Sequence, residues 1–334
     1  MKTSDRRYCL VTPCRNEAEY AARSIDSVLR QSVRPALWVI VDDGSTDETP
    51  QILAEYARRH SFIRVIRRTD RGHRYVGAGV IEAFNEGLAT IDIEDFAYLC
   101  KLDLDLILPS RYFEYLMERM EANARVGTCS GKPYYRAASG KYVSEKCGDE
   151  NSIGASKFYR RECFQEIGGF VSGIMWDGID CHRCRMLGWI AASWDDSETR
   201  FEHLRPMGSS HKSMWNGRKR HGQGQYFMGY SPAFVFASAL YRSGSRPWLV
   251  GSTAILWGYF TSLISRAPRY QNREFVKSLR NYQWRSLVVG KRCALTRIHA
   301  AHEHMWRSRH STNGETPLDV EPHQSSLSAS VADG

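Results

Sequence analysis

Leu37 to Asp47 reads LWVIVDDGSTD, an apolar run that ends in two aspartates and a small polar turn. Five consecutive apolar residues, Leu37 to Val41, are typical of a strand that is buried on both faces. Thr49 and Pro50 follow the turn, and both are favoured at the start of a helix whose apolar residues then recur at helical spacing. This stretch therefore predicts a strand, a polar turn and a helix.

The same order of elements is repeated on either side of this stretch. Upstream, an apolar run from Tyr8 to Thr12 leads into a polar turn and a helical pattern that extends to Leu29. Downstream, further apolar runs occur at Phe62–Ile66 and Phe96–Cys100. Alternating strands and helices are typical of an α/β domain with a mostly parallel sheet flanked by helices, whose ligands bind at the carboxyl ends of the strands. We expect this domain to cover residues 1–205.

Composition supports a folded chain with an unevenly distributed charge. The 334 residues are 42% hydrophobic and 25% charged, which excludes a mostly disordered protein. Residues 205–310 contain 18 Lys and Arg but only two acids, Glu274 and Glu303, so this segment carries +16, and the remainder of a chain with net charge +9 carries −7. Phosphate headgroups and phosphodiesters both attract such a segment, which leaves an anionic membrane surface and a nucleic acid as candidate partners.

Two charge-free stretches within the basic segment, 222–241 and 247–265, favour the membrane. Each has nearly the length needed to span a bilayer, but Gly, Ser, Thr and Gln dilute both, so interfacial or re-entrant helices are expected. We therefore predict a helical, membrane-associating extension over residues 206–310 and no nucleic-acid partner. Residues 311–334 lack aromatics and are rich in Ser, Pro and acids, which predicts a disordered tail.

The cysteines and the N-terminus indicate a cellular compartment. The nine cysteines are scattered and odd in number, and residues 1–13 contain no apolar run long enough for a secretory signal. We expect a cytoplasmic protein that associates peripherally with the inner face of the membrane. Cys181 and Cys184 form a single C-x-x-C without a second pair nearby, which favours ordinary helix cysteines over zinc or redox chemistry.

The first candidate site is the polar turn itself. Asp42 and Asp43 stand at a strand end, where carboxylates can accept hydrogen bonds from a base edge or ribose hydroxyls, and Gly44 lets the backbone approach a ligand. The alternative is that the turn merely caps the next helix.

A second candidate is Asp103-Leu104-Asp105, which follows the apolar run ending at Cys100. Alternate residues of a strand share one face, so both carboxylates could hold Mg²⁺ or Mn²⁺, and that cation would stabilise a diphosphate leaving group. A solvated turn is the alternative, although stray acids between leucines would be costly.

The third candidate, Trp176-Asp177-Gly178-Ile179-Asp180, places acids at a predicted helix start. Such an acid could deprotonate an acceptor hydroxyl, or it could simply cap the helix.

Together, the order and spacing of these motifs resemble the family 2 glycosyltransferases of the GT-A fold over about residues 6–205. Thr12-Pro13-x-Arg15-Asn16-Glu17 looks like the opening nucleotide motif of that family, the turn at Asp42 matches its nucleoside loop, and Asp103-Leu104-Asp105 is similar to its metal-binding D-x-D. The nucleotide-binding residues that we carry over are Thr12, Pro13, Arg15, Asn16, Glu17, Asp42, Asp43, Gly44, Ser45 and Lys101.

The resemblance also implies roles for the remaining site residues. Asp105 would be the chief metal ligand, Asp103 would contact the sugar or the metal, and His203 would be a further metal or phosphate contact if it is not structural. The catalytic base of the family normally lies in a Glu-Asp pair, which here reads Trp176-Asp177, so Asp177 is the aligned base and Asp180 its rival. The segment 148–157 resembles the acceptor-facing stretch of the family.

The resemblance implies an inverting, metal-dependent hexosyltransferase. The expected donor is a nucleotide-diphosphate sugar, with a UDP-sugar favoured, and the expected acceptor is a saccharide or a lipid-linked molecule in cell-surface polysaccharide or glycolipid biosynthesis. Gln283-Trp284-Arg285 is no full match to the Gln-x-x-Arg-Trp motif of processive synthases, which favours single additions. The alternatives are a polyprenyl-phosphate sugar synthase, a nucleotide-sugar-binding membrane scaffold and a nucleic-acid binder.

Overall fold

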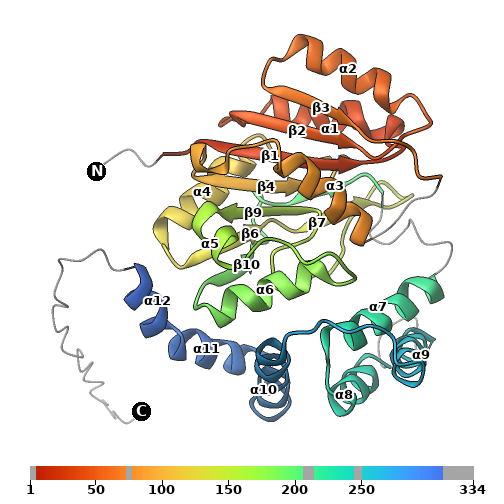
Figure 1. Cartoon of the computed structure of the whole chain (residues 1–334), viewed down its shortest axis with the longest axis vertical. Coiled ribbons are helices and arrows are strands. Elements are labelled where there is room, and N and C mark those ends of the chain that lie inside the picture. The colour runs from red at the N-terminus through yellow and green to blue at the C-terminus, as the bar shows by residue number, and fades with distance from the viewer. Residues whose placement is uncertain (1–4, 73–76, 206–213, 244–249, 311–334) are drawn as a thin grey trace, which may run out of the picture.

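The computed structural model describes residues 5–72, 77–205, 214–243 and 250–310. Figure 1 shows an α/β body around a central sheet and a set of C-terminal helices, α7 to α10, on the side opposite to α2. The tail predicted at 311–334 lies outside the described residues.

The central sheet has seven strands in the order β10-β6-β9-β4-β1-β2-β3. Only β9 runs antiparallel to its neighbours among the pairs that the described residues form, which confirms the mostly parallel sheet. The strands are β1 (Tyr8–Cys14), β2 (Leu37–Asp42), β3 (Ile63–Arg67), β4 (Tyr98–Leu102), β6 (Val126–Ser130), β9 (Ser156–Arg160) and β10 (Ile190–Ser193).

Helices cover both faces of this sheet. Successive strand residues point to opposite faces, so Tyr8 and Leu10 enter one core while Cys9 and Val11 enter the other. Residues of α1, α2 and α4 pack into the first core, and residues of α3, α5 and α6 pack into the second. The helices are α1 (Ala18–Leu29), α2 (Thr49–Arg59), α3 (Ala78–Leu88), the 3₁₀ helix η1 (Ile93–Asp95), α4 (Tyr112–Ala122), α5 (Arg161–Glu166) and α6 (Trp176–Met186).

A second, four-stranded sheet was not predicted, because strands of two to four residues carry no readable periodicity. Its order is β5-β11-β7-β8, formed by β5 (Leu106–Ile107), β11 (Phe201–His203), β7 (Pro133–Arg136) and β8 (Tyr142–Ser144). Because β11 pairs with β5, His203 lies opposite Leu106, next to Asp105.

The predicted extension is helical. It consists of α7 (Met214–Met228), α8 (Pro232–Ser243), α9 (Val250–Ile264), α10 (Arg273–Val289), α11 (Lys291–Ala301) and α12 (Glu303–His310). The stretch 222–241 is divided between α7 and α8, and Gly229 has a positive φ of 86° at the break. No helix within the described ranges has both the length and the apolar character needed to cross a bilayer.

Candidate active site

The predicted site residues follow β1, β2 and β4, at the point where the strand order changes direction. From β1, the strands β2 and β3 follow on one side and β4 on the other. In open α/β sheets a crevice forms outside the carboxyl ends of the strands at such a point. The fold therefore brings the first two motifs to one edge of the sheet.

Asp42 fits both interpretations of the polar turn, the structural one and the ligand-binding one. Its Oδ1 accepts a hydrogen bond from the Ser45 backbone N–H at 2.9 Å, which closes the turn. Its Oδ2 is buried without a hydrogen-bond partner among the described residues, and the nearest cation, Arg67 Nε, lies 3.7 Å away. Because an unpaired buried carboxylate oxygen is costly, this atom is a candidate acceptor for a ligand donor.

Asp43 is held by basic residues. Its Oδ1 accepts from Arg68 at 2.6 Å and from Arg71 at 2.7 Å, while its backbone carbonyl accepts from Arg15 at 2.5 Å. Arg15 also pairs with Asp70 at 2.6 Å. The carboxylate is therefore fixed at the strand end by a network that leaves it 11% exposed.

The loop after β1 is joined directly to the turn after β2. Asn16 adopts a left-handed φ of 55°, its amide oxygen accepts from the Thr46 N–H at 2.8 Å, and its own N–H donates to Ser45 Oγ at 2.9 Å. Thr12 is fully buried, and its hydroxyl accepts from the Trp38 indole at 2.9 Å. Asn16 and Ser45 thus shape the rim of the site, whereas the contacts of Thr12 support a packing role.

Asp103 and Asp105 lie in a turn between β4 and β5, not within a strand, so strand alternation does not place them as we expected. β4 ends at Leu102, and the chain turns before it joins the second sheet. The Lys101 amine pairs with Asp103 and donates to the Gly154 carbonyl at 2.9 Å. Lys101, predicted to bind the nucleotide, is therefore buried and holds the D-x-D turn.

Asp105 is the better buried of the two acids. Its Oδ2 accepts from Arg205 at 2.9 Å and lies 3.6 Å from His203 Nε2. Arg205 also donates to Glu17 at 2.8 Å, so one guanidinium joins the opening motif to the D-x-D. Asp105 Oδ1 is buried and has no hydrogen-bond partner in the described part of the chain.

Burial and the neighbouring charges shift the pKa values of Asp103 and Asp105 in opposite directions. Burial raises the pKa of Asp103, and the nearby charge of Asp105 adds to the rise. Burial would also raise the pKa of Asp105, but His203 and Arg205 outweigh it and lower that pKa. Against the effect of burial, the carboxylates of Asp105 and Glu145 raise the pKa of His203 to about 10, so its ring is protonated at neutral pH.

These residues fit a hard cation only in part. Across the described segments, no group of three or more His, Cys, Asp or Glu side chains is arranged to hold a metal ion. Asp105 Oδ1 and the Asp103 carboxylate are nevertheless the ligands that Mg²⁺ prefers, and that ion is usually completed by waters and substrate phosphates. The site therefore suits a cation that a bound diphosphate would help to coordinate.

Asp177 lies in the first turn of α6, but Met175 is the N-cap, so the helix-capping alternative is wrong. A Cβ placed on Gly154 would lie 3.0 Å from Asp177 Oδ2, which shows how closely this half-buried carboxylate approaches Gly154. Since Gly154 accepts from Lys101, a continuous line of contacts connects Asp177 to Asp103.

Asp180, the rival base, faces the core. Its side chain is 1% exposed and pairs with Lys157, itself fully buried, at 2.5 Å. The Tyr159 hydroxyl donates to the same oxygen, and Lys157 also donates to the Asp177 carbonyl at 2.8 Å. This geometry supports a structural role for Asp180, and it removes Lys157 from the predicted acceptor-facing surface.

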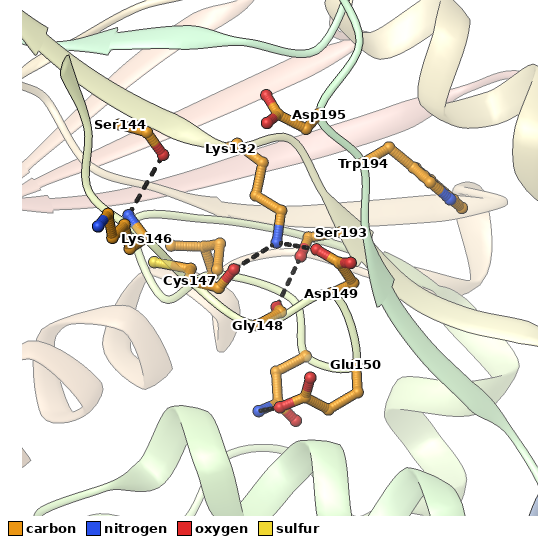
Figure 2. Close-up of polar contacts among 12 residues, drawn as sticks. Lys132, Ser144, Lys146, Cys147, Gly148, Asp149, Glu150, Ser193, Trp194 and Asp195 are labelled. Atoms are coloured by element: carbon orange, nitrogen blue, oxygen red, sulfur yellow. Dashed lines mark hydrogen bonds and ion pairs between the residues drawn. The ribbon is translucent and has the colours of Figure 1, made fainter. Parts of the chain in front are cut away.

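Lys132, which the sequence analysis did not single out, holds the start of the predicted acceptor-facing segment 148–157 in place. Figure 2 shows the buried Lys132 amine in contact with the Cys147 carbonyl and the Asp149 carboxylate, each at 2.8 Å. Ser193 Oγ donates to the Gly148 carbonyl at 3.1 Å. The loop is thereby tied to the ends of β6 and β10, while the Asp149 side chain remains 84% exposed.

Two further site residues, Glu145 and Arg220, were missed. The Glu145 carboxylate accepts a hydrogen bond from His203 Nδ1 at 2.8 Å. Arg220, on α7, approaches so closely that a Cβ on Gly77 would lie 2.7 Å from its Nη2. Burial lowers the pKa of Arg220, and the negative charge of the Asp177 carboxylate opposes this, so the guanidinium interacts electrostatically with the candidate base. The only sequence signal for Arg220 was the basic character of residues 205–310.

The comparisons with known proteins agree with this geometry. Residues 9–176 match the model of the family described as glycosyl transferase family 2, and the chain belongs to that family. A poly-β-1,6-N-acetyl-D-glucosamine synthase of Staphylococcus epidermidis is 29% identical over 126 residues, which cover 38% of this chain and 28% of that protein. The uncharacterized glycosyltransferase EpsJ of Bacillus subtilis is 30% identical over 114 residues, 34% of this chain and 30% of that protein. The matched segment thus spans less than a third of either relative.

Solved structures share the fold. A mannosyltransferase from Pyrobaculum calidifontis, in complex with GDP-Man and Mn²⁺, superimposes with a TM-score of 0.50 at 18% identity and covers 90% of this chain and 88% of its own. GalNAc-T7 with UDP, GalNAc and Mn²⁺ gives a TM-score of 0.53 at 14% identity, covering 85% and 58%. At these identities the likeness establishes the GT-A fold.

Proposed function

We propose that this chain transfers a hexose from a nucleotide-diphosphate sugar, with a UDP-sugar favoured, to a hydroxyl of a saccharide or lipid-linked acceptor with inversion. The observation that carries the proposal is the unpartnered, buried Oδ1 of Asp105, which lies beside Arg205 in the same turn as Asp103. Asp103 pairs with Lys101, and Lys101 donates to Gly154, which lies next to Asp177. The Staphylococcus epidermidis relative supports a role in cell-surface polysaccharide or glycolipid biosynthesis.

We assign each of these residues a separate role in the reaction. Asp42 and Asp43 would receive the nucleoside at the end of β2, and Arg205 would face the diphosphate. Mg²⁺ or Mn²⁺, held by Asp105 with Asp103, would supply charge neutralisation to the leaving diphosphate when bound. Asp177 would take the proton of the acceptor hydroxyl, whose oxygen then attacks the anomeric carbon from the face opposite the diphosphate and inverts it.

The test combines a donor screen with a base variant. Thermal shift in Mn²⁺ with a panel of nucleotide sugars identifies the donor, because a ligand that binds the native state stabilises it. With that donor, Asp177→Asn should lower kcat about 10²- to 10⁴-fold and leave donor affinity unchanged. Glu162→Gln, an exposed change on α5, is the matched control and should retain full turnover. Full turnover in Asp177→Asn would refute the assignment.

A polyprenyl-phosphate sugar synthase is the second candidate, favoured by the Arg220 guanidinium near Asp177, which suits a phosphate acceptor. A lipid phosphate is already ionised and needs no general base. Transfer to polyprenyl phosphate that survives Asp177→Asn, with no transfer to saccharides, would select this candidate.

We also place the enzyme at the cytoplasmic face of a membrane. The charge of +16 on residues 205–310 and the apolar helices of the same region support this proposal.

A further inference from the structure

Exposed apolar side chains are concentrated in the C-terminal extension. Among the described residues, every exposed large hydrophobic side chain except Tyr142 lies beyond residue 214. On α9, Val250, Trp257, Phe260 and Ile264 recur at helical spacing and are 55%, 57%, 38% and 80% exposed. They form one stripe along the helix that no described residue covers.

α8 also carries exposed apolar side chains. Phe236 and Leu240 are 59% and 66% exposed, four residues apart, so they share a face of α8. The two helices are packed together, and the Ser252 hydroxyl of α9 donates to the Ala239 carbonyl of α8 at 2.8 Å. The exposed residues of α8 and α9 therefore belong to one packed helical unit.

A cationic cavity adjoins this unit at the start of α10. It has a volume of about 760 Å³ and is lined by Arg273, Lys277 and Arg280, together with uncharged residues. The three cations are four and three residues apart on one helix face. Glu274, the one acid of α10, does not line the cavity. Tyr270, which does, follows Ile264 by only six residues.

The cations of this cavity lack the counter-ions that other arginines have. Arg6 and Arg111, for example, pair with glutamates at 2.6 and 2.8 Å. By contrast, no carboxylate lies within ion-pair distance of Arg273, Lys277 or Arg280 in the part of the chain that the structure describes. Of the three side chains, only that of Arg280 has a hydrogen bond to another described residue, from its Nε to the Gly229 carbonyl at 3.0 Å. Three like charges around one cavity favour an anionic occupant.

We propose that α8, α9 and α10 form a docking face for an anionic phospholipid bilayer, in which the cavity holds a headgroup phosphate and the stripe around Trp257 enters the acyl boundary. Surface helices of this kind bury their apolar face about 5–10 Å into the bilayer and add electrostatic attraction. The inference rests on the proposed membrane attachment, to which it assigns a surface, and is independent of sugar transfer. Figure 1 shows these helices on the side of the molecule opposite to α2.

Two other occupants fit the observations less well. A second copy of the chain would bring another cationic cavity against the first, and like charges in contact repel. A nucleic acid would satisfy the cations but would leave the exposed apolar side chains of Phe236 and Ile264, 59% and 80% exposed, in water.

Vesicle sedimentation of the full chain tests the proposal. The protein should bind vesicles of phosphatidylcholine with 30% phosphatidylglycerol and bind pure phosphatidylcholine weakly. Each basic residue at an anionic surface strengthens binding roughly fivefold, so the double variant Arg273→Gln, Lys277→Gln should bind about 25-fold more weakly. The matched control, Arg292→Gln with Arg297→Gln, removes the same charge from exposed positions on α11 and should change binding no more than about threefold.

The apolar half of the face has its own test. Trp257→Ser with Ile264→Ser should weaken vesicle binding even at high salt, where the electrostatic contribution is screened. All variants should bind the nucleotide donor as the wild type does, so loss of docking and failure of the transferase proposal are read separately.

Four results would overturn the proposal. The first is equal losses of vesicle binding in the cavity and control variants. The second is equal binding to neutral and anionic vesicles. The third is a protein that does not bind vesicles but is stabilised by millimolar inorganic phosphate, with the stabilisation lost in the cavity variant. That result would assign the cavity to a soluble phosphate. The fourth is a concentration-dependent dimer that the Trp257→Ser change abolishes, because it would assign the face to a second copy.

Discussion

Replacing Asp180 should cost stability, whereas replacing Asp177 on the same helix should cost turnover. Asp180 and Lys157 are 1% and 0% exposed and pair at 2.5 Å. In Asp180→Asn the buried ammonium would retain the Asp177 carbonyl at 2.8 Å and the Cys181 sulfur at 3.2 Å as partners, but no opposite charge. Removing one member of a buried ion pair costs about 3–5 kcal/mol. Asp177→Asn alters a half-buried carboxylate and should change the free energy of unfolding by less than about 1 kcal/mol.

Urea denaturation measures this difference. With a slope of about 3 kcal/mol per molar urea, a loss of 3–5 kcal/mol lowers the midpoint by about 1–1.7 M. The double variant Lys157→Met, Asp180→Leu should recover most of the loss, because replacing both partners with apolar groups removes the unpaired charge. If Asp180→Asn unfolds at the wild-type midpoint and is inactive, the carboxylate acts in chemistry and the structural interpretation is wrong.

Three further changes probe the packing, the charges and the site. Gly258→Ala should lower the free energy of unfolding by about 1–3 kcal/mol, because the added Cβ would lie 1.9 Å from a carbonyl oxygen of α7. Hydrogen exchange should then accelerate in α7 and α9 alone, and equal acceleration in the central sheet would contradict this. Burial lowers the pKa of His299 to about 4, so between pH 6.5 and 4 the unfolded chain binds a proton that the folded chain does not. The free energy of unfolding should therefore fall as the pH is lowered through this range, and it should fall less steeply in His299→Asn. Arg205→Met should lower stability by about 1–3 kcal/mol because it removes a partner of the buried Asp105, whereas Arg200→Met, at an exposed position, should lower it by less than about 0.5 kcal/mol.

The catalytic half of the fold could be predicted because each buried strand is followed by a polar turn. Runs such as Leu37–Val41 indicate strands, and parallel strands bring their carboxyl ends to one edge, so the approach of Arg15 to Asp43 follows from the order of elements alone. The second sheet could not be predicted from strands of two to four residues, and with it the contact of His203 with Glu145 was missed.

The proposal of Asp177 rather than Asp180 as the base also depends on the structure. Asp177 and Asp180 are three residues apart, a spacing that places them near each other on a helix surface. They differ because the buried ammonium of Lys157, on β9, pairs with the carboxylate of Asp180 but contacts only the backbone carbonyl of Asp177. The role of Arg220 depends in the same way on how α7 packs, and no local pattern in the sequence specifies that packing.

Calorimetric titration of UDP and GDP, with Mn²⁺ or with a chelator, tests the central claim most directly. We expect at least one nucleotide to bind in Mn²⁺, and we expect both chelation and Asp105→Asn to weaken that binding tenfold or more. Binding of neither nucleotide, or equal affinity in Mn²⁺, in chelator and in Asp105→Asn, would contradict a nucleotide-diphosphate site at Asp105.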